Sequence, residues 1–369
     1  MRAARSGSAR IGLYLLLVLL PLAGAVLLNP AGGGFLTELG RSAALAGYMI
    51  LLLQGVLASR WKWVERPFGL DMVLRFHRNI AVLAVLLLVA HPLLLAAGGR
   101  GWGLVLSLDL PWYIWAGKVA LLLLLLNALS SLIRRRLGLS FERWRLVHDV
   151  VGPLLIVAGL VHGLYAGRDL GQGTLRACLI VVVGGAIAVF VHHRIVRPRL
   201  LRRKSYRVTE VATEAEGVWT VKLAPPEGES PYEYRPGQFH FLTFHRDRGL
   251  PEEEHHWTIS SSPTEEGTVA STIKSLGDFT STIGETRPGD RASVHAPFGR
   301  FSYTLHPGED DLVFVAGGIG ITPLMSMLRH MRDRGDPRKV LLLYGSPDEE
   351  SIVFRDELEE IEAGRAPRL

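Results

Sequence analysis

The pattern of hydrophobic positions divides the chain into two parts with different periods. Long runs rich in leucine and valine fill about the first 200 residues, and each of six is long enough to cross a bilayer core of about 30 Å. These runs are roughly 11–29, 42–58, 72–96, 112–133, 146–166 and 175–193. The second is short and is interrupted by Gln54. The sequence therefore predicts a six-helix transmembrane bundle over residues 1–200.

After Lys204 the pattern changes to short alternating segments bounded by turn residues, which are typical of β-strands. Segments 206–211, 218–223 and 238–244 alternate in this way, and Arg235-Pro236-Gly237 predicts a turn before the third. We expect an antiparallel β-barrel over 205–307. A partial α/β Rossmann-like domain is expected over 311–369, with strands at 312–316 and 340–344 and helices at 324–331 and about 351–362.

Basic residues are unequally shared between the two ends of the predicted helices. One side carries 17 lysines and arginines and the other carries Arg41, Arg100, Arg168 and Arg176. The positive-inside rule then predicts a multi-pass cell-membrane protein with both termini cytoplasmic. The first run is alternatively a cleaved signal peptide, with Ala23-Gly24-Ala25 as a weak cleavage site. The net charge of +6 reflects this topology, so we expect membrane lipid and no nucleic acid as a partner.

The chain has one cysteine, Cys178, within an apolar run. A single cysteine excludes an internal disulfide and any zinc or iron–sulfur site built from several cysteines within this chain.

Four histidines inside the apolar runs form two pairs, His77 with His91 and His148 with His162. Both pairs are separated by 14 residues. Fourteen helical residues make about four turns and about 21 Å, so both members lie on nearly one face. Two such helices facing each other present two stacked bis-histidine sites, the geometry that holds two b-type haems. In the predicted topology His77 and His148 form the inner site, and His91 and His162 the outer one. The alternative is that each histidine binds a neighbouring carbonyl.

Four cations lie within or at the ends of the predicted membrane helices. Arg75 and Arg78 flank His77 and are candidates for the inner haem propionates. Arg41 and Lys118 are candidates for the outer haem or for an anionic acceptor. Snorkelling towards lipid headgroups is the alternative for all four.

Two segments of the predicted barrel suit a flavin. In His255-His256-Trp257-Thr258 an aromatic ring that can stack on the isoalloxazine precedes a hydroxyl that can bond near N5, and Ser261 follows. Lys274, Gly277 and Thr280 supply a cation, a glycine and a hydroxyl where strand turns to helix, a good place for a pyrophosphate. The alternatives are an ordinary exposed strand and a solvated turn.

A glycine-rich turn follows the 312–316 strand directly and leads into a helix. It contains Gly317, Gly318, Gly320, Thr322 and Pro323. Strand, glycine turn and helix with proline in the first turn are typical of a dinucleotide phosphate site. Ser346 follows the next strand at the corresponding position. The sequence therefore predicts NAD(P)H binding after the flavin-type barrel.

Six helices with paired histidines followed by a ferredoxin-reductase-like module resemble the transmembrane ferric reductase and NADPH oxidase superfamily over nearly the whole chain. The resemblance implies that His77, His91, His148 and His162 are haem ligands. It also implies that His255, His256, Trp257 and Thr258 occupy the flavin stretch His-Pro-Phe-Thr. Segment 294–299 resembles the family's Pro-Phe-Gly turn.

The chain departs from this family in its last domain. The family continues to a Cys-Gly-Pro segment beside the nicotinamide, whereas only two βα units are present here, so the predicted nucleotide domain is incomplete. Pro347 stands where the family often has an arginine for a 2′-phosphate, so a preference for NADPH over NADH is not supported.

The leading hypothesis is a transmembrane oxidoreductase of the NAD(P)H oxidase or ferric reductase type. It passes electrons from NAD(P)H through FAD and two b-type haems to an extracytoplasmic acceptor, with no side chain required as a general base. The resemblance implies oxygen, giving superoxide, or a ferric chelate as the acceptor. One alternative is a diheme membrane subunit that receives electrons from a separate reductase. Another is a haem-free channel or transporter with a histidine proton relay.

Overall fold

The structure is a computed structural model that describes residues 2–28, 33–167, 173–364 and 366–369. The chain forms two compact units, Met1–Val196 and Arg197–Leu369. Arg168, one of the cations used to predict topology, lies outside the described residues. The finer division into 1–200, 205–307 and 311–369 stays a prediction.

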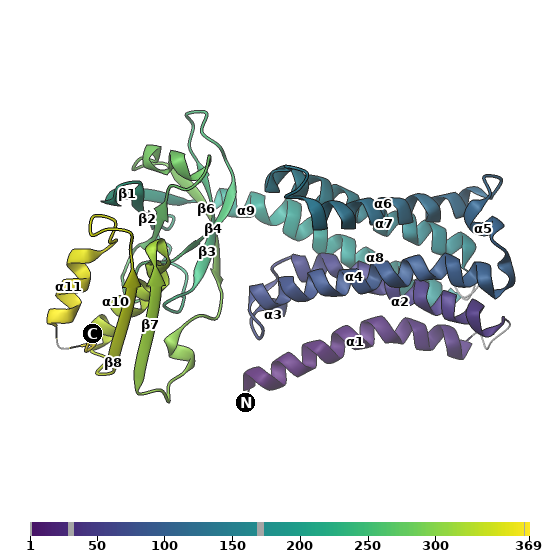
Figure 1. Ribbon diagram of the computed structural model, residues 1–369, viewed down its shortest axis with the longest axis horizontal. Coiled ribbons are helices and arrows are strands. Elements are labelled where there is room, and N and C mark those ends of the chain that lie inside the picture. Colours follow the sequence, from purple (N-terminus) through teal and green to yellow (C-terminus); the bar gives the residue numbers. More distant parts are fainter. Residues whose placement is uncertain (1, 29–32, 168–172, 365) are drawn as a thin grey trace. The chain divides into compact units, whose positions relative to one another are not determined.

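Among the described residues of the first unit, six helices are long and apolar enough to cross a membrane, as the hydrophobic runs predicted (Figure 1). They are α1 (Arg2–Leu28), α2 (Phe35–Ala58), α4 (Leu70–Leu95), α6 (Trp112–Ile133), α7 (Phe141–Ala166) and α8 (Gly173–Val191). The short helices α3 (Lys62–Glu65) and α5 (Gly103–Leu106) lie in the connections. A lipid environment favours helices because all their backbone polar groups are satisfied within the segment.

Several helix bounds differ from the predicted ones. Helix α2 begins at Phe35 rather than near residue 42, because the polar residues Thr37 and Glu38 form part of its first turns. Helices α4 and α8 continue into wide turns, η1 (Ala96–Arg100) and η3 (His192–Val196).

Small residues bring α2 close to its neighbours. A Cβ on Gly47 would lie 2.9 Å from the Leu88 side chain of α4. A Cβ on Gly159 of α7 would lie 2.6 Å from the ring of Tyr48, whose hydroxyl donates to the Ile156 carbonyl at 2.6 Å. Small residues at such contacts are typical of packed membrane helices. Helix α2 is therefore held against both histidine-bearing helices, α4 and α7.

The second unit begins with α9 (Arg197–Arg203) and an antiparallel six-stranded sheet. Its strands are β1 (Tyr206–Ala215), β2 (Val218–Ala224), β3 (Phe239–His245), β4 (Glu254–Thr258), β5 (Val269–Lys274) and β6 (Arg291–Phe298). The order is β4-β3-β6-β1-β2-β5. The outer strands meet where Ser260 N–H donates to the Ala270 carbonyl at 2.8 Å. Fully buried apolar residues, including Val221, Leu242 and Phe244, fill the interior, so the predicted barrel is confirmed.

Two βα units follow the barrel. They consist of β7 (Asp311–Gly317), the 3₁₀ turn η6 (Gly318–Ile321), α10 (Thr322–Arg334), β8 (Lys339–Gly345) and α11 (Arg355–Ala363). Strands β7 and β8 are parallel, which confirms a partial Rossmann-like arrangement. The predicted start of α11 near residue 351 was wrong, because Phe354 adopts a left-handed conformation (φ 63°) just before the helix.

The β7–β8 sheet has one covered face. Leu312, Phe314 and Val340 pack against α10, while the alternate residues point the other way and are exposed. The exposed set is Val313, Val315, Leu341 and Leu343, each more than half exposed. Parallel sheets are normally covered on both faces, whereas this apolar face is exposed in the part of the chain that the structure describes.

Candidate functional site

The four predicted histidines form two facing pairs within the first unit. His77 of α4 faces His148 of α7, with ring centroids 6.5 Å apart and an angle of 69° between the planes. His91 of α4 faces His162 of α7 at 6.3 Å and 74°. The 14-residue spacing on each helix thus places two nearly equal imidazole pairs at two levels.

A second set of residues with the same spacing contacts the outer sides of these rings. His91 Nδ1 lies 2.9 Å from the Gly40 carbonyl of α2, and His162 Nδ1 lies 2.8 Å from the Tyr113 carbonyl of α6. His148 Nδ1 lies 3.2 Å from Asn127 Oδ1 of α6. Tyr113 and Asn127 are 14 residues apart, as are their two histidines. A carbonyl oxygen only accepts, so each of these Nδ1 atoms carries the hydrogen and each Nε2 keeps its lone pair.

His77 differs from the other three histidines in the contact made by its Nδ1 atom. Its Nδ1 is buried and has no hydrogen bond of normal geometry, although the Gln54 carbonyl of α2 interacts with it electrostatically. Gln54 stands 14 residues after Gly40. Helix α2 therefore approaches the two α4 histidines as α6 approaches the two α7 histidines.

The predicted cations near the histidines take different roles. Arg41 forms an ion pair with Glu38 at 2.8 Å. Lys118 Nζ donates to the Val105 and Ser107 carbonyls, both at 2.9 Å, and so ties the segment around α5 to α6. Arg75 and Arg78 are exposed on α4.

One charged pair beside the histidines was not foreseen. Asp149, next to His148, forms an ion pair with Arg194 of η3, and Arg145 lies 3.9 Å from the same carboxylate. This pair attaches the end of α8 to α7. An acidic residue within an apolar run was the sequence feature that marked it.

The predicted flavin segments lie together at the edge of the barrel. The ring of His255 on β4 stacks on Phe279 of the following turn, with centroids 4.3 Å apart. In that turn Thr280 Oγ1 accepts from the Leu276 and Gly277 backbone N–H groups at 2.8 and 2.9 Å. Trp257 Nε1 is buried without a hydrogen-bond partner, and a Cβ on Gly277 would meet open space. An indole donor in need of an acceptor and an open glycine turn fit a flavin nucleotide.

The remaining predicted flavin residues differ in how exposed they are. His256 is exposed beside Phe239 and Phe241, and Lys274 is half-buried. Ser261 is fully buried, and its hydroxyl accepts from the Ala270 backbone N–H and bonds Tyr234. The structure does not bring Ser261 to the surface formed by the other residues.

A buried polar chain supports Thr258 from inside the barrel. His240 is fully buried; its Nδ1 lies 2.6 Å from the Tyr232 hydroxyl and its Nε2 lies 2.6 Å from Ser271 Oγ. Ser271 Oγ donates to the Thr258 carbonyl at 2.9 Å. Because Ser271 uses its only hydroxyl hydrogen in this bond, it can only accept from His240. His240 Nε2 therefore donates to Ser271, and Nδ1 accepts from the Tyr232 hydroxyl. Burial lowers the pKa of His240 to about 3, which keeps the ring neutral.

The predicted nucleotide residues gather at one end of the parallel sheet. Gly317 and Gly345 are register partners on β7 and β8, so the two turns lie side by side. A Cβ on Gly317, Gly318 or Gly320 would meet nothing within 4 Å, and Gly318 has a φ of 49°. The Thr322 hydroxyl donates to the Ile319 carbonyl, and Pro323 follows in the first turn of α10. Ser346 Oγ is buried without a partner, so it fits a ribose or phosphate oxygen.

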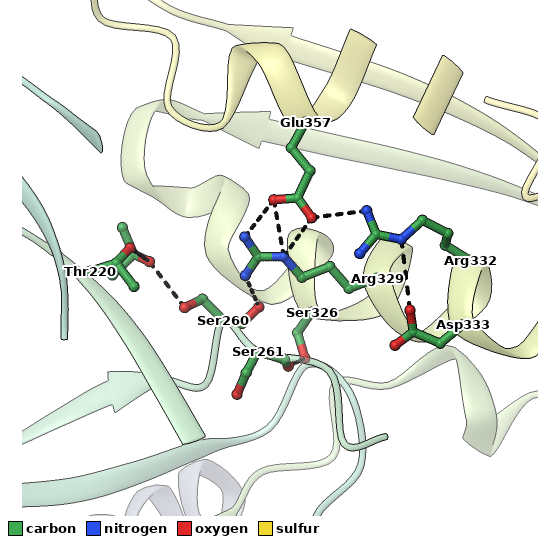
Figure 2. Close-up of polar contacts among 9 residues, drawn as sticks. Thr220, Ser260, Ser261, Ser326, Arg329, Arg332, Asp333 and Glu357 are labelled. Atoms are coloured by element: carbon green, nitrogen blue, oxygen red, sulfur yellow. Dashed lines mark hydrogen bonds and ion pairs between the residues drawn. The ribbon is translucent and has the colours of Figure 1, made fainter. Parts of the chain in front are cut away.

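The barrel and the βα units are joined by hydrogen bonds that the sequence did not predict (Figure 2). Ser326 and Arg329 of α10 donate to the carbonyls of Ser261 and Ser260, and Glu357 of α11 binds Arg329. A groove of about 650 Å³ lies between Arg329, Asp333 and Glu357 on one side and strands β1 and β2 on the other. Its charged residues pair mostly with one another, as Lys222 does with Glu210 at 3.0 Å.

Comparison with known protein families places two parts of the chain. The ferric reductase like transmembrane component matches residues 43–159, which include three of the four paired histidines and end just before His162. The oxidoreductase NAD-binding domain matches residues 314–369. The chain is therefore similar to these two families over the matched residues. The order of the two matches, a ferric reductase like transmembrane component followed by an oxidoreductase NAD-binding domain, is similar to the architecture of ferric reductases and NADPH oxidases.

Individual relatives are similar to parts of the chain. The propane 2-monooxygenase reductase component of Rhodococcus jostii (strain RHA1) is 32% identical over 43% of this chain and 42% of its own length. The sulfhydrogenase 2 subunit gamma of Pyrococcus furiosus is 33% identical over 41% of this chain and 51% of its own. The solved structure of phthalate dioxygenase reductase is 26% identical, with a TM-score of 0.37, over 42% of this chain and 47% of that one. The chain spans about half the length of the curated relatives it matches.

Proposed function

We propose that this protein carries electrons from NAD(P)H through FAD and two b-type haems to an acceptor across the membrane. Oxygen, giving superoxide, and a ferric chelate are the candidate acceptors. When bound, the nicotinamide supplies a hydride, the flavin separates its two electrons, and the haem irons transfer single electrons. The remaining task of the protein is to hold these groups in line and to exclude water.

The spacing of the imidazole pairs carries this proposal. Two imidazoles that bound one metal ion through their nitrogens would have centroids about 6 Å apart, because a histidine–metal bond is about 2 Å long and a ring centroid lies about 1 Å behind its nitrogen. The observed 6.5 and 6.3 Å agree with this separation at both levels. Two imidazoles hydrogen-bonded directly to each other would lie closer. Each gap therefore has the width for one metal atom.

The hydrogen bonds behind the rings support the same conclusion. Gly40, Tyr113 and Asn127 accept from Nδ1, which leaves Nε2 as the available ligand atom on His91, His162 and His148. Histidines that bind metals nearly always donate their other N–H to an oxygen in this way, which fixes the ring and raises its basicity.

The residues of the second unit would act by binding and orientation. Trp257 and Thr258 would hold the flavin ring, while the turn around Gly277 and Thr280 would receive phosphate. The glycine turn at Gly317–Gly320 and the free hydroxyl of Ser346 would bind the nucleotide.

The direction of transfer follows from the predicted topology. With both termini cytoplasmic, the His77–His148 pair would lie nearer the cytoplasmic side of the membrane and the His91–His162 pair nearer the other side. Arg41 and Lys118 then stand at the acceptor end and Arg75 and Arg78 at the entry end, where propionates or an anionic acceptor would benefit from positive charge.

Haem content and anaerobic reduction test this function. Detergent-purified protein should contain two haems per chain, and NADH or NADPH should reduce them once FAD is bound. His162→Ala should lose one haem, whereas His192→Ala, at the end of α8 and outside both pairs, should retain both. Two haems retained in His162→Ala would contradict the ligand assignment. Purified protein free of haem would favour the proton-relay alternative.

One observation favours a second candidate, a diheme subunit that receives electrons from a separate reductase. The apolar face formed by Val313, Val315, Leu341 and Leu343 is suited to another protein surface. In that case dithionite should reduce the haems and neither nucleotide should do so until the partner reductase is added.

A further inference from the structure

One face of α10 contacts the segment that continues directly from the flavin strand β4. Ser326 Oγ donates to the Ser261 carbonyl at 2.6 Å, and Arg329 Nη1 donates to the Ser260 carbonyl at 2.7 Å. One turn further on, Asp333 accepts from the Thr264 hydroxyl. Helical residues spaced by three and four share one face, so this is a continuous line of contacts.

Arg329 is also held from the opposite side by α11. Its Nη2 donates to Glu357 Oε2 at 2.6 Å and its Nε donates to Glu357 Oε1 at 3.0 Å (Figure 2). The two-pronged contact fixes the orientation of the planar guanidinium as well as its position. Arg329 thereby links three chain segments: the continuation of β4, the helix after β7 and the helix after β8.

The residue before α11 supports the guanidinium. The Phe354 ring lies 4.8 Å beneath the guanidinium carbon of Arg329. Phe354 adopts φ 63°, a left-handed conformation that is unfavourable for a residue with a side chain and persists only where the surroundings impose it. This strain lies at the contact with Arg329.

These contacts lie close to both candidate cofactor sites. Ser260 stands two residues after Thr258 of the flavin segment. Ser326 stands one helical turn after Thr322, which closes the nucleotide turn, a distance of about 6 Å along the helix axis. Ser260, Ser261 and Ser326 are all fully buried. A buried carbonyl that loses its donor is costly, so the contacts resist separation.

We propose that Arg329, oriented by Glu357, is a positioning residue that sets the approach of the nicotinamide nucleotide to the flavin. This inference rests on the proposed function of the second unit. Arg329 does not contact either cofactor site itself. Its role is to hold the flavin strand and the nucleotide turn at a fixed separation, and a displacement of about 1 Å can slow a transfer step about a hundredfold.

The test compares Arg329→Lys with Arg332→Ala in the full-length, FAD-loaded protein. Lysine keeps the charge but loses the fork that reaches Glu357 and Ser260 together. Arg332 is a matched control, because it lies on α10 and binds Glu357 at 3.1 Å but has its other ion pair with Asp333 rather than with the barrel. The readouts are anaerobic flavin reduction by NADH and NADPH, and hydrogen exchange of segments 260–264 and 317–322.

Arg329→Lys should slow flavin reduction at least about tenfold at saturating nucleotide, with FAD content unchanged. It should also speed exchange in both segments, and Arg332→Ala should do neither. If exchange rises but flavin reduction is unchanged, Arg329 is merely structural and the inference is overturned. If the nucleotides reduce the flavin equally fast in the wild type and in Arg329→Lys, the inference is overturned but the proposed function stands. A wild type that neither nucleotide reduces overturns the proposed function and the inference with it.

Discussion

Gly117 of α6 lies directly against the imidazole of His162 on α7. A Cβ added at Gly117 would stand 2.6 Å from Nδ1 and 2.7 Å from Cε1 of that ring. The ring occupies the space that any other side chain would need. The orientation of His162 therefore depends on the absence of a side chain on a neighbouring helix.

This contact predicts that Gly117→Ala disturbs one histidine pair and spares the other. The added methyl group should displace His162, so the purified variant should lose one of two haems or show an altered spectrum for it. The reduced α band and the haem-to-protein ratio measure this. Gly152→Ala is the matched control on α7, since its Cβ would meet nothing within 4 Å. Equal haem content together with identical reduced α bands in all three proteins would contradict the prediction.

Asn127→Leu should change the haem at the other level. Losing the acceptor of His148 Nδ1 makes that ligand less basic, which stabilises the ferric state less. We expect the midpoint potential of the His77–His148 haem to rise and haem retention there to weaken about 10–100-fold. A spectroelectrochemical titration resolves the two haems. Ser131→Ala, which alters a hydroxyl bonded to the Asn127 carbonyl at 2.7 Å, should leave both potentials unchanged.

The buried ring of His240 predicts that the barrel is less stable in mild acid. Its pKa is lowered from 6.5 to about 3 by burial, so the unfolded chain binds the proton more readily between these values. Stability is therefore full above about pH 6.5 and falls with decreasing pH, by up to about 1.4 kcal/mol per unit. The temperature of FAD release, measured from pH 7.5 to pH 5, reports this loss.

His240→Gln separates this effect from other titrations. The amide can accept from Tyr232 and donate to Ser271 but does not titrate, so the fall in FAD-release temperature should become shallower. His306→Gln is the control, because His306 is 61% exposed. An identical pH dependence in His240→Gln and wild type would show that another group is responsible.

Lys118→Met should loosen the segment around α5. Both of its carbonyl acceptors, Val105 and Ser107, would lose their donor, so hydrogen exchange of residues 103–107 should increase. If Lys118 also attracts an anionic acceptor, KM for an anionic ferric chelate should rise severalfold with haem content unchanged. An unchanged KM would show that Lys118 acts only through its hydrogen bonds to the Val105 and Ser107 carbonyls.

The sequence predicted the features that depend on periodicity. Six apolar runs, three alternating segments and a 14-residue histidine spacing each follow from regular geometry, and the helices and strands were confirmed. Helix α2 was predicted too short because Thr37 and Glu38 are helical but polar. The start of α11 was misplaced because nothing in the sequence marks Phe354 as left-handed.

The residues that support the candidate sites were mostly not predictable. Gly40 and Tyr113 act through main-chain carbonyls, which every residue has. Asn127 could have been found by applying the 14-residue interval to polar residues in neighbouring runs. Arg329 and Glu357 are 28 residues apart, on helices joined through a strand, and neither is distinguished from the surrounding charges until the chain is folded.

The acceptors behind the imidazoles differ in how freely mutation can change them. Gly40 and Tyr113 offer their main-chain oxygens to His91 and His162, and these oxygens remain whatever side chain is substituted. Asn127 offers a side-chain oxygen to His148, and a substitution at position 127 can remove or replace this oxygen. Evolution and protein engineering therefore have a direct means of adjusting the His77–His148 level, while the other level is largely fixed by the backbone. If the two pairs hold haems as proposed, the driving force for electron transfer between them is adjustable mainly at the His77–His148 level.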